Sequence, residues 1–226
     1  MALVKIEGVS KVFKEASLPV QALTSIHVEI QKGEFTAFCG PSGSGKTTLL
    51  NLIGCLDRPS EGKVHLENEE VSSLAQGKLA TIRRRKIGFI FQDFNLIPTL
   101  TVRENIEYVL WLQGETESLR RQKSKALAER FGIGKLLSRR PAQISRGQQQ
   151  RVACARAIIH KPLLIIGDEL TANLDHKTGA ELMDFIKKLN REEGLTFLYA
   201  THDPIMMERA SRVVRMQDGR IIDGKG

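Results

Sequence analysis

A glycine-rich run, Gly40-Pro41-Ser42-Gly43-Ser44-Gly45-Lys46-Thr47, matches at every fixed position a pattern that holds phosphate chains. Glycine opens backbone conformations that are closed to other residues, so such a loop can wrap phosphates and aim its N–H groups inward. Lys46 has the reach for the β- and γ-phosphates, and the Thr47 hydroxyl suits a Mg²⁺ ion. With a strand-like run before it (34–39) and a helix-like run after it (47–53), we predict that this phosphate loop binds a nucleoside triphosphate, in preference to a chance glycine-rich turn.

Two carboxylates, Asp168 and Glu169, end an apolar run that begins at Leu163. A run this apolar suits a central parallel strand, and ligands of such sheets bind at the carboxyl ends of the strands. Because successive strand residues point in opposite directions, the two acids can divide the work. We expect Asp168 in the Mg²⁺ shell and Glu169 as the group that orients and deprotonates the attacking water. The alternative is a strand end with two solvated acids.

Ser145 and Gln148 have the spacing of a capping box, which alone predicts only the start of a helix. The periodicity continues this helix to Ile159. Its first backbone N–H groups are free and suit an anion such as a phosphate.

Strand-like and helix-like segments alternate along the chain, as the positioning of these residues requires. Short strands fill residues 1–35, with a break near Ser17-Leu18-Pro19. Further strands are expected at 63–67, 87–91, 163–166 and 195–200, helices at 101–112, 118–131, 145–159 and 177–191, and a hairpin at 213–222. This order predicts a parallel sheet covered on both faces and, from about 94 to 160, an inserted helical lobe.

The composition fits one globular domain: 226 residues, 41% hydrophobic and 27% charged. No apolar run approaches the roughly 20 residues that span a bilayer, and no apolar signal segment opens the chain, so we expect a cytoplasmic protein. Three cysteines without metal-ligand spacing, Cys39, Cys55 and Cys154, are read as free thiols.

The net charge of +8 suits nucleic acid, nucleotide or an anionic membrane surface. Its densest run, Arg83-Arg84-Arg85-Lys86, is explained by cations at a helix C-terminus. Aromatic residues make up only 5% and do not interleave with the basic clusters, so we expect no nucleic-acid partner.

In sequence order, these segments resemble the ATP-binding cassette (ABC) ATPases. Ile144-Ser145-Arg146-Gly147-Gln148 is similar to the family's signature, usually Leu-Ser-Gly-Gly-Gln, and lies shortly before the acid pair. Phe13 matches the aromatic residue that stacks on adenine, and Gln92 the glutamine that touches Mg²⁺ and water and senses the membrane partner. Asn173-Leu174-Asp175 matches the loop that crosses the dimer interface, and His202 the histidine that contacts the γ-phosphate. The resemblance covers residues 3 to 223, nearly the whole chain.

The resemblance implies an α/β fold: a P-loop NTPase (RecA-like) core with a mostly parallel sheet, an N-terminal antiparallel β subdomain and an inserted helical subdomain. A single ATPase domain would fill 1–226, with the β subdomain and nucleotide-binding core in 1–93 and 157–226. The helical signature subdomain would be 94–156.

The resemblance also implies ATP and Mg²⁺ as cofactors and a division of roles among the matched residues. The catalytic residues are Glu169, His202 and Gln92, and the metal-binding residues are Thr47, Gln92 and Asp168. The residues that contact ATP are Phe13, all eight residues of the phosphate loop, Thr48, Ser145, Gly147, Gln148 and Asp175. Two copies of the chain would sandwich two ATP molecules, so that each site is complete only in the dimer.

Two positions depart from the family pattern. Arg146 replaces the first glycine of the signature, and Leu170 replaces the proline that usually follows the acid pair. Neither change removes a functional group, and we expect Arg146→Gly to keep activity.

A chain of this kind needs a separate integral membrane permease, which places it on the cytoplasmic face of the cell membrane. The apolar loop Phe94-Asn95-Leu96-Ile97-Pro98 is a candidate docking site. Finer similarity, at 51–57, 88–92, 100–106 and 171–175, favours the bacterial lipoprotein-releasing and macrolide-efflux branch. The alternatives are a cell-division ATPase that regulates cell-wall hydrolysis and a non-transport ATPase that acts on ribosomes or DNA.

Overall fold

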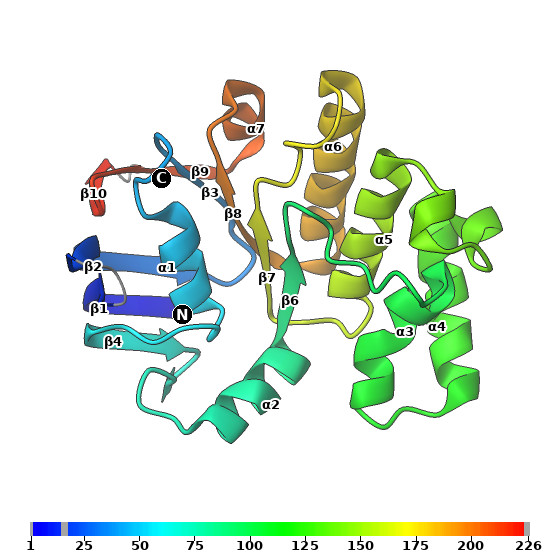
Figure 1. The fold of residues 1–226 in the computed structure, drawn as a ribbon, viewed down its shortest axis with the longest axis horizontal. Helices are drawn as coiled ribbons and strands as arrows, with labels where there is room; N and C mark the ends of the chain where they lie inside the picture. Colours follow the sequence, from blue (N-terminus) through cyan, green and yellow to red (C-terminus); the bar gives the residue numbers. More distant parts are fainter. Residues whose placement is uncertain (1, 15–17, 224–226) are drawn as a thin grey trace.

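Two β-sheets organise the protein in this computed structural model, which describes residues 2–14 and 18–223. The first sheet is antiparallel, in the order β2-β1-β4-β5 (Figure 1). It consists of β1 (Ala2–Phe13), β2 (Val20–Gln31), β4 (Glu61–Leu66) and β5 (Glu69–Glu70). The predicted N-terminal antiparallel subdomain is thereby confirmed, while Ser17, in the predicted break, lies outside the described residues.

The second sheet has the order β10-β9-β3-β8-β7-β6, and all its pairs are parallel except β9 with β10. Its strands are β3 (Phe35–Cys39), β6 (Ile87–Ile90), β7 (Leu164–Asp168), β8 (Thr196–Thr201), β9 (Arg212–Gln217) and β10 (Arg220–Asp223). The mostly parallel sheet and the terminal hairpin were both predicted from the alternation of apolar runs with helical segments.

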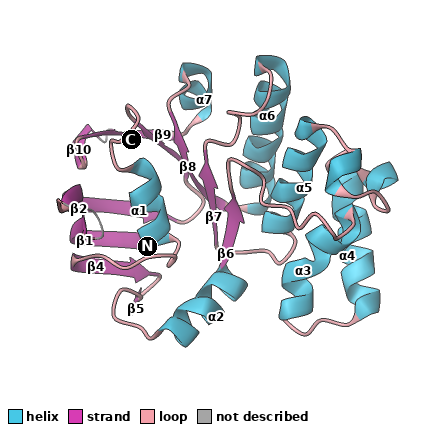
Figure 2. Ribbon diagram, in the orientation of Figure 1, coloured by secondary structure: helices cyan, strands magenta, loops and turns pink. Residues whose placement is uncertain are grey.

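Helices flank this sheet and also form a lobe of their own (Figure 2). They are α1 (Lys46–Ile53), α2 (Gln76–Lys86), α3 (Val102–Leu112), α4 (Glu117–Arg130), α5 (Arg146–Ile158), α6 (His176–Glu193) and α7 (Pro204–Arg209). Helices α3, α4 and α5 pack together at the end of the molecule opposite the antiparallel sheet. This is the predicted helical subdomain; its boundaries at 94 and 156 stay a prediction. Among the described residues, no helix combines the length and the apolar character that a membrane span needs.

The central strands are buried on both faces and serve two cores. In β8, Phe197 and Tyr199 belong to the core shared with α5 and α6, whereas Leu198 and Ala200 belong to the core shared with β1, β2 and α1. Alternate residues of a strand point to opposite faces, which explains the continuous apolar runs of these strands.

The parallel arrangement brings the predicted site residues to one edge of the sheet. Cys39 at the end of β3 pairs with Thr201 at the end of β8, and Asp168 at the end of β7 pairs with Ala200. The phosphate loop, the acid pair and His202 follow these three ends directly, so three distant sequence segments meet there.

Candidate active site

A cleft of about 670 Å³ lies at this edge of the sheet, and we call it the phosphate-loop cleft. It gathers side chains from the phosphate loop, from the ends of β7 and β8, and from the loop after β6. Its lining consists of Val20, Gln21, Ala22, residues 41–48, Gln92, Asp168, Glu169, Ala172 and His202. The predicted catalytic and metal-binding residues, together with most of the phosphate loop, are therefore brought together within one chain.

Two glycines of the phosphate loop are required by geometry. Gly40 has φ +156°, and a Cβ on it would lie 2.1 Å from the carbonyl oxygen of Met216. Gly45 caps α1 with φ +96°, and a Cβ there would lie 2.7 Å from the carbonyl oxygen of Ala22. Any side chain at either position would push the loop off its supporting strands, since both obstacles are backbone atoms.

Lys46 is nearly buried and turns back over its own loop. Its Nζ donates to the carbonyl oxygens of Gly40 at 2.9 Å and Pro41 at 3.0 Å. The Oγ of Ser44 is buried without a hydrogen-bond partner among the described residues. A bound phosphate offers an acceptor to both groups, so the loop fits the triphosphate that its sequence predicts.

Thr47 and Asp168 form the candidate metal centre. The Thr47 Oγ1 donates to Asp168 Oδ1 at 3.2 Å. Burial raises the pKa of the Asp168 carboxyl, and Glu169 adds to this effect, while the Thr47 hydrogen bond and Lys46 oppose it. Among the described residues, no group of three or more His, Cys, Asp or Glu side chains is arranged so that it could hold a metal ion. One hydroxyl and one carboxylate suit Mg²⁺, a hard ion that usually takes one or two protein oxygens and completes its shell with phosphates and water.

Glu169 and His202 are in direct contact. The Nδ1 of His202 lies 2.9 Å from Oε1 of Glu169, whose side chain is 18% exposed against 69% for His202. Glu169 has φ +47°, a conformation that a non-glycine residue holds only when its surroundings impose it. Its backbone N–H donates to Ala200 in β8, at 3.2 Å. The carboxylate is thus aimed into the cleft by its strand and oriented by a histidine, an arrangement suited to a general base.

Gln92 lines the cleft and is tied to the loop after β7. Its carbonyl oxygen accepts a hydrogen bond from Asn173 Nδ2 at 2.9 Å. The predicted glutamine and the predicted interface loop are therefore neighbours in one chain.

The residues of the signature lie outside the cleft. Ser145 Oγ accepts from the Gln148 N–H at 3.3 Å, and Gln148 Oε1 accepts from the Ser145 N–H at 2.9 Å. The capping box at the start of α5 is thus confirmed. Gly147 allows α5 to pack against α6, because a Cβ on it would lie 3.1 Å from Thr178 Cγ2. Asp175 caps α6 by accepting from the Thr178 N–H at 3.0 Å and also lies away from the cleft lining.

Phe13, the predicted adenine contact, lies beside the cleft. It pairs with Val20, which lines the cleft, but is not itself part of the lining. Its ring is 38% exposed, with Lys11 Nζ 4.9 Å from the ring centroid. An exposed ring next to the cleft is available for stacking, and its role stays a prediction.

Both departures from the family pattern have a structural explanation. Leu170 is buried against Gly167, where an added Cβ would lie 2.6 Å from Leu170 Cδ2, so it acts as a core side chain. Arg146 is exposed, and its Nη1 donates to Asn173 Oδ1 at 3.3 Å.

Sequence reasoning missed the contribution of β2 to the cleft. Val20, Gln21 and Ala22 line it, yet they carry no motif and belong to a strand of ordinary alternation. Only the packing of the phosphate loop against β2 places them there, a long-range contact with no local signal.

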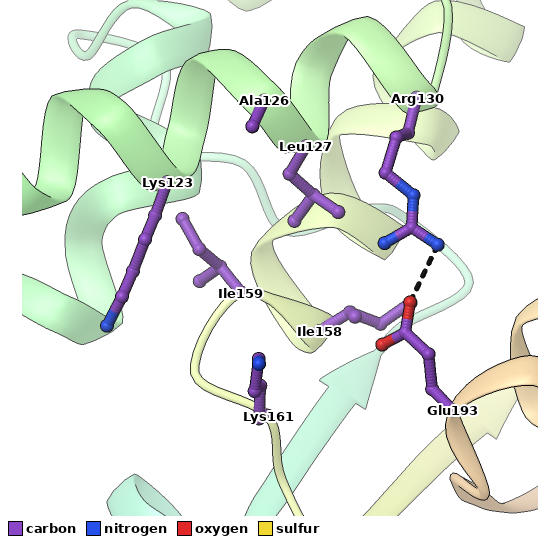
Figure 3. Close-up of a pocket in the computed structure, with 8 residues that line it drawn as sticks. All are labelled: Lys123, Ala126, Leu127, Arg130, Ile158, Ile159, Lys161 and Glu193. Atoms are coloured by element: carbon purple, nitrogen blue, oxygen red, sulfur yellow. Dashed lines mark ion pairs between the residues drawn. The ribbon is translucent and has the colours of Figure 1, made fainter.

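A separate hollow of about 240 Å³ lies between α4, the end of α5 and the end of α6, away from the phosphate loop (Figure 3). Apolar side chains form its base, and an ion pair of 2.6 Å between Arg130 and Glu193 crosses its rim. This ion pair joins the helical lobe to α6. It shares no lining residue with the phosphate-loop cleft.

Comparison with known proteins adds family evidence to this geometry. The sequence model of the ABC transporter family matches residues 23–172. An uncharacterized ABC transporter ATP-binding protein of Thermotoga maritima is 45% identical over 219 residues, which are 97% of this chain and 93% of the relative. The macrolide export ATP-binding/permease protein MacB of Syntrophobacter fumaroxidans is 42% identical over 98% of this chain, which spans 31% of MacB.

A solved structure shows the same architecture. It is a dimeric, post-hydrolysis state of the ATP-binding cassette MJ0796 bound to ADP and Pi, from a protein of Methanocaldococcus jannaschii. The TM-score is 0.92 at 40% identity, and the match covers 98% of this chain and 97% of that one.

Proposed function

The chain belongs to the ABC transporter family of ATPases, and from this premise we propose that it is the ATP-hydrolysing subunit of a bacterial transporter. ATP-driven closure of a dimer powers a separate membrane subunit, of the mechanotransmission type that releases lipoproteins or drives efflux. The observation that carries the proposal is the phosphate-loop cleft, where the loop, Gln92, the acid pair and His202 converge.

The residues of the cleft divide the hydrolysis among them. Lys46 and the loop N–H groups bind the β- and γ-phosphates, and Thr47, Asp168 and Gln92 hold Mg²⁺. When bound, Mg²⁺ neutralises phosphate charge. Glu169 takes the proton of the attacking water, and His202 keeps the Glu169 carboxylate oriented while its ring remains accessible to the γ-phosphate.

A second copy of the chain completes each site. The start of α5, with Ser145, Gly147 and Gln148, lies outside the cleft of its own chain, as does Asp175. The dimeric state of the MJ0796 cassette with ADP and Pi supports a two-chain arrangement. Within it, as the family resemblance implies, the signature of one copy would meet the nucleotide of the other.

The membrane partner docks in a groove of about 360 Å³ between α2, β6 and α3. Its lining combines apolar and basic side chains: Leu56, Phe89, Phe91, Val109 and Leu112 with Arg83, Arg84 and Arg156. Two of the apolar side chains, Leu56 and Leu112, are exposed. Trp111, 58% exposed, continues the apolar surface on α3. An apolar segment that carries a carboxylate fits both features.

Two consecutive residues connect the groove with the cleft. Phe91 lines the groove and Gln92 lines the cleft. Arg156 in α5 donates to the carbonyl oxygen of Phe94 at 2.7 Å and so holds the following loop in place. A partner that shifts this loop therefore shifts Gln92, which supports the proposed coupling.

The branch within the family rests on the similarity to MacB, a protein named for both ATP binding and a permease. The cell-division type remains the alternative, and copurification with division proteins would favour it. The non-transport alternative would be favoured by salt-sensitive binding of nucleic acid.

Capture of the partner tests the docking groove. Tagged chain is incubated with detergent-solubilised membranes, and we expect it to retain a membrane-spanning permease that raises its ATPase rate. Leu112→Glu, in the groove, is expected to abolish both effects, because it replaces an apolar contact with a carboxylate that competes with the partner's own for the arginines of the groove. Leu18→Glu is the same exchange at an exposed leucine just before β2 of the antiparallel sheet, and it should leave partner retention and the ATPase rate unchanged. Equal retention by the two variants would contradict the proposed groove.

A further inference from the structure

Arg146 takes part in a chain of hydrogen bonds that joins three segments of the protein. Its Nη1 donates to Asn173 Oδ1 at 3.3 Å, and Asn173 Nδ2 donates to the Gln92 carbonyl oxygen at 2.9 Å. Both ends of the Asn173 amide are used, which fixes its orientation. We call this the Arg146–Asn173–Gln92 tether. It links the start of α5, the loop after β7 and the loop after β6.

The loop that the tether holds is internally braced. Within it, the Ala172 N–H donates to Glu169 at 3.1 Å and the Leu174 N–H donates to Thr171 at 3.0 Å. At its end, Asp175 caps α6. A restraint on Asn173 is therefore a restraint on the whole of residues 169–175, from the candidate base to the predicted interface aspartate.

We propose that Arg146 is a positioning residue that sets the surface with which the chain meets its second copy. This inference rests on the proposed function, in which the start of α5 and the 169–175 loop both face the partner copy. A surface held in its bound arrangement before association loses less conformational freedom on association, so the dimer forms at lower chain concentration. The usual glycine of the signature cannot make this contact.

A direct contact between Arg146 and the partner's nucleotide has less support. The guanidinium already donates to Asn173 Oδ1 within its own chain, at 3.3 Å. The two roles differ in one measurable way: a positioning residue acts only through Asn173, whereas a phosphate contact acts without it.

Sedimentation of the ATP-bound dimer in a Glu169→Gln background tests the proposal. Arg146→Ala is expected to raise the dimer dissociation constant about 10-fold, because the 169–175 loop of both chains must then be ordered on association. The ATP affinity of the single chain stays the same. Arg146→Lys recovers most of the loss, since its ammonium group can donate to the same Asn173 oxygen.

A double-mutant cycle separates the two roles. Asn173→Ala breaks both bonds of the tether, so Arg146→Ala adds nothing to it and the double variant dissociates like Asn173→Ala alone. Additive losses, or an Arg146→Ala dimer as tight as its parent, would overturn the inference. Arg130→Ala is the matched control: it removes one arginine and the 2.6 Å ion pair to Glu193, on the side of the lobe seen in Figure 3, and leaves the dissociation constant unchanged.

Dimerisation of the Glu169→Gln parent with ATP distinguishes a failure of this inference from a failure of the proposed function on which it rests. If the Glu169→Gln chain does not dimerise with ATP, the proposed two-chain site fails and the role of Arg146 fails with it. If the Glu169→Gln parent dimerises with ATP, and the Arg146 and Asn173 variants dimerise as tightly as this parent, the proposed function stands and the role given to the tether is wrong.

Discussion

Glu169 is the residue in which conformation and contact point most directly to chemistry. It combines a left-handed backbone with φ +47°, a partly buried carboxylate and a histidine partner at 2.9 Å. Ordinary strand ends need none of these features. The solvated acid pair, the alternative interpretation of the sequence, is harder to reconcile with a Glu169 held in this way.

Removal of the Glu169 carboxylate should separate hydrolysis from binding. Glu169→Gln keeps the shape of the side chain but cannot take a proton, so we expect turnover to fall roughly 10²–10⁴-fold while ATP affinity is retained. The measurement is phosphate release beside equilibrium binding of ATP. Glu181→Gln, the same exchange at an exposed position of α6, serves as the control. Unchanged turnover in Glu169→Gln would remove Glu169 from its role.

At the residue scale, the sequence predicted those positions whose chemistry is written in a local pattern. The phosphate loop and the acid pair have fixed spacing and flanks, and both lie in the cleft. Gln21 and Ala22 were missed because only tertiary packing places them there. The partnership of Arg146 with Asn173 was missed for the same reason, although the unusual arginine was visible in the sequence.

The junction between α5 and β6 shows how tightly the helical lobe is fitted to the sheet. Gly88 lies in β6, and a Cβ added there would lie 2.1 Å from the carbonyl oxygen of Ala157 in α5. A backbone atom cannot move aside as a flexible side chain can, so α5 depends on a glycine at this point for its close approach to the strand.

This close approach predicts opposite effects for two alanine substitutions. Gly88→Ala should lower the free energy of unfolding by about 1–3 kcal/mol, because the methyl group forces α5 and β6 apart. Gly77→Ala, in α2 with nothing within 4 Å of the added Cβ, should raise it by up to about 1 kcal/mol through helix propensity. Urea unfolding of both variants checks the pair. A Gly88→Ala variant as stable as wild type would show that the junction is loose.

At the element scale, long periodic segments were predictable and short ones were not. Helices α3 to α6 and the central strands lie within a few residues of their expected positions. Helix α7, with six residues, is too short to show a period. For α2, which buries only Leu79 and Ile82, the basic C-terminal end at Arg83 to Lys86 was expected and is confirmed, but no apolar period gave its start. Such elements take their structure from what they pack against, which a local pattern does not contain.

The whole molecule carries a net charge of +8, so two copies repel each other as they approach. ATP is an anion, and the proposed dimer places two of them between the chains. Nucleotide therefore adds both contacts and charge compensation, which makes association depend on ATP. The sequence predicts this arrangement only through its resemblance to a family, because no local pattern shows which surfaces of two chains meet.

The rate of ATP hydrolysis per chain, measured against chain concentration, tests most directly whether each site needs two chains. We expect the specific rate to be very low in dilute solution, to rise with concentration and to level off when the chains are paired. Lys46→Ala should remove activity at every concentration, which excludes a contaminating ATPase. A specific rate that stays constant across the range would show that one chain hydrolyses ATP alone and would contradict the two-chain site.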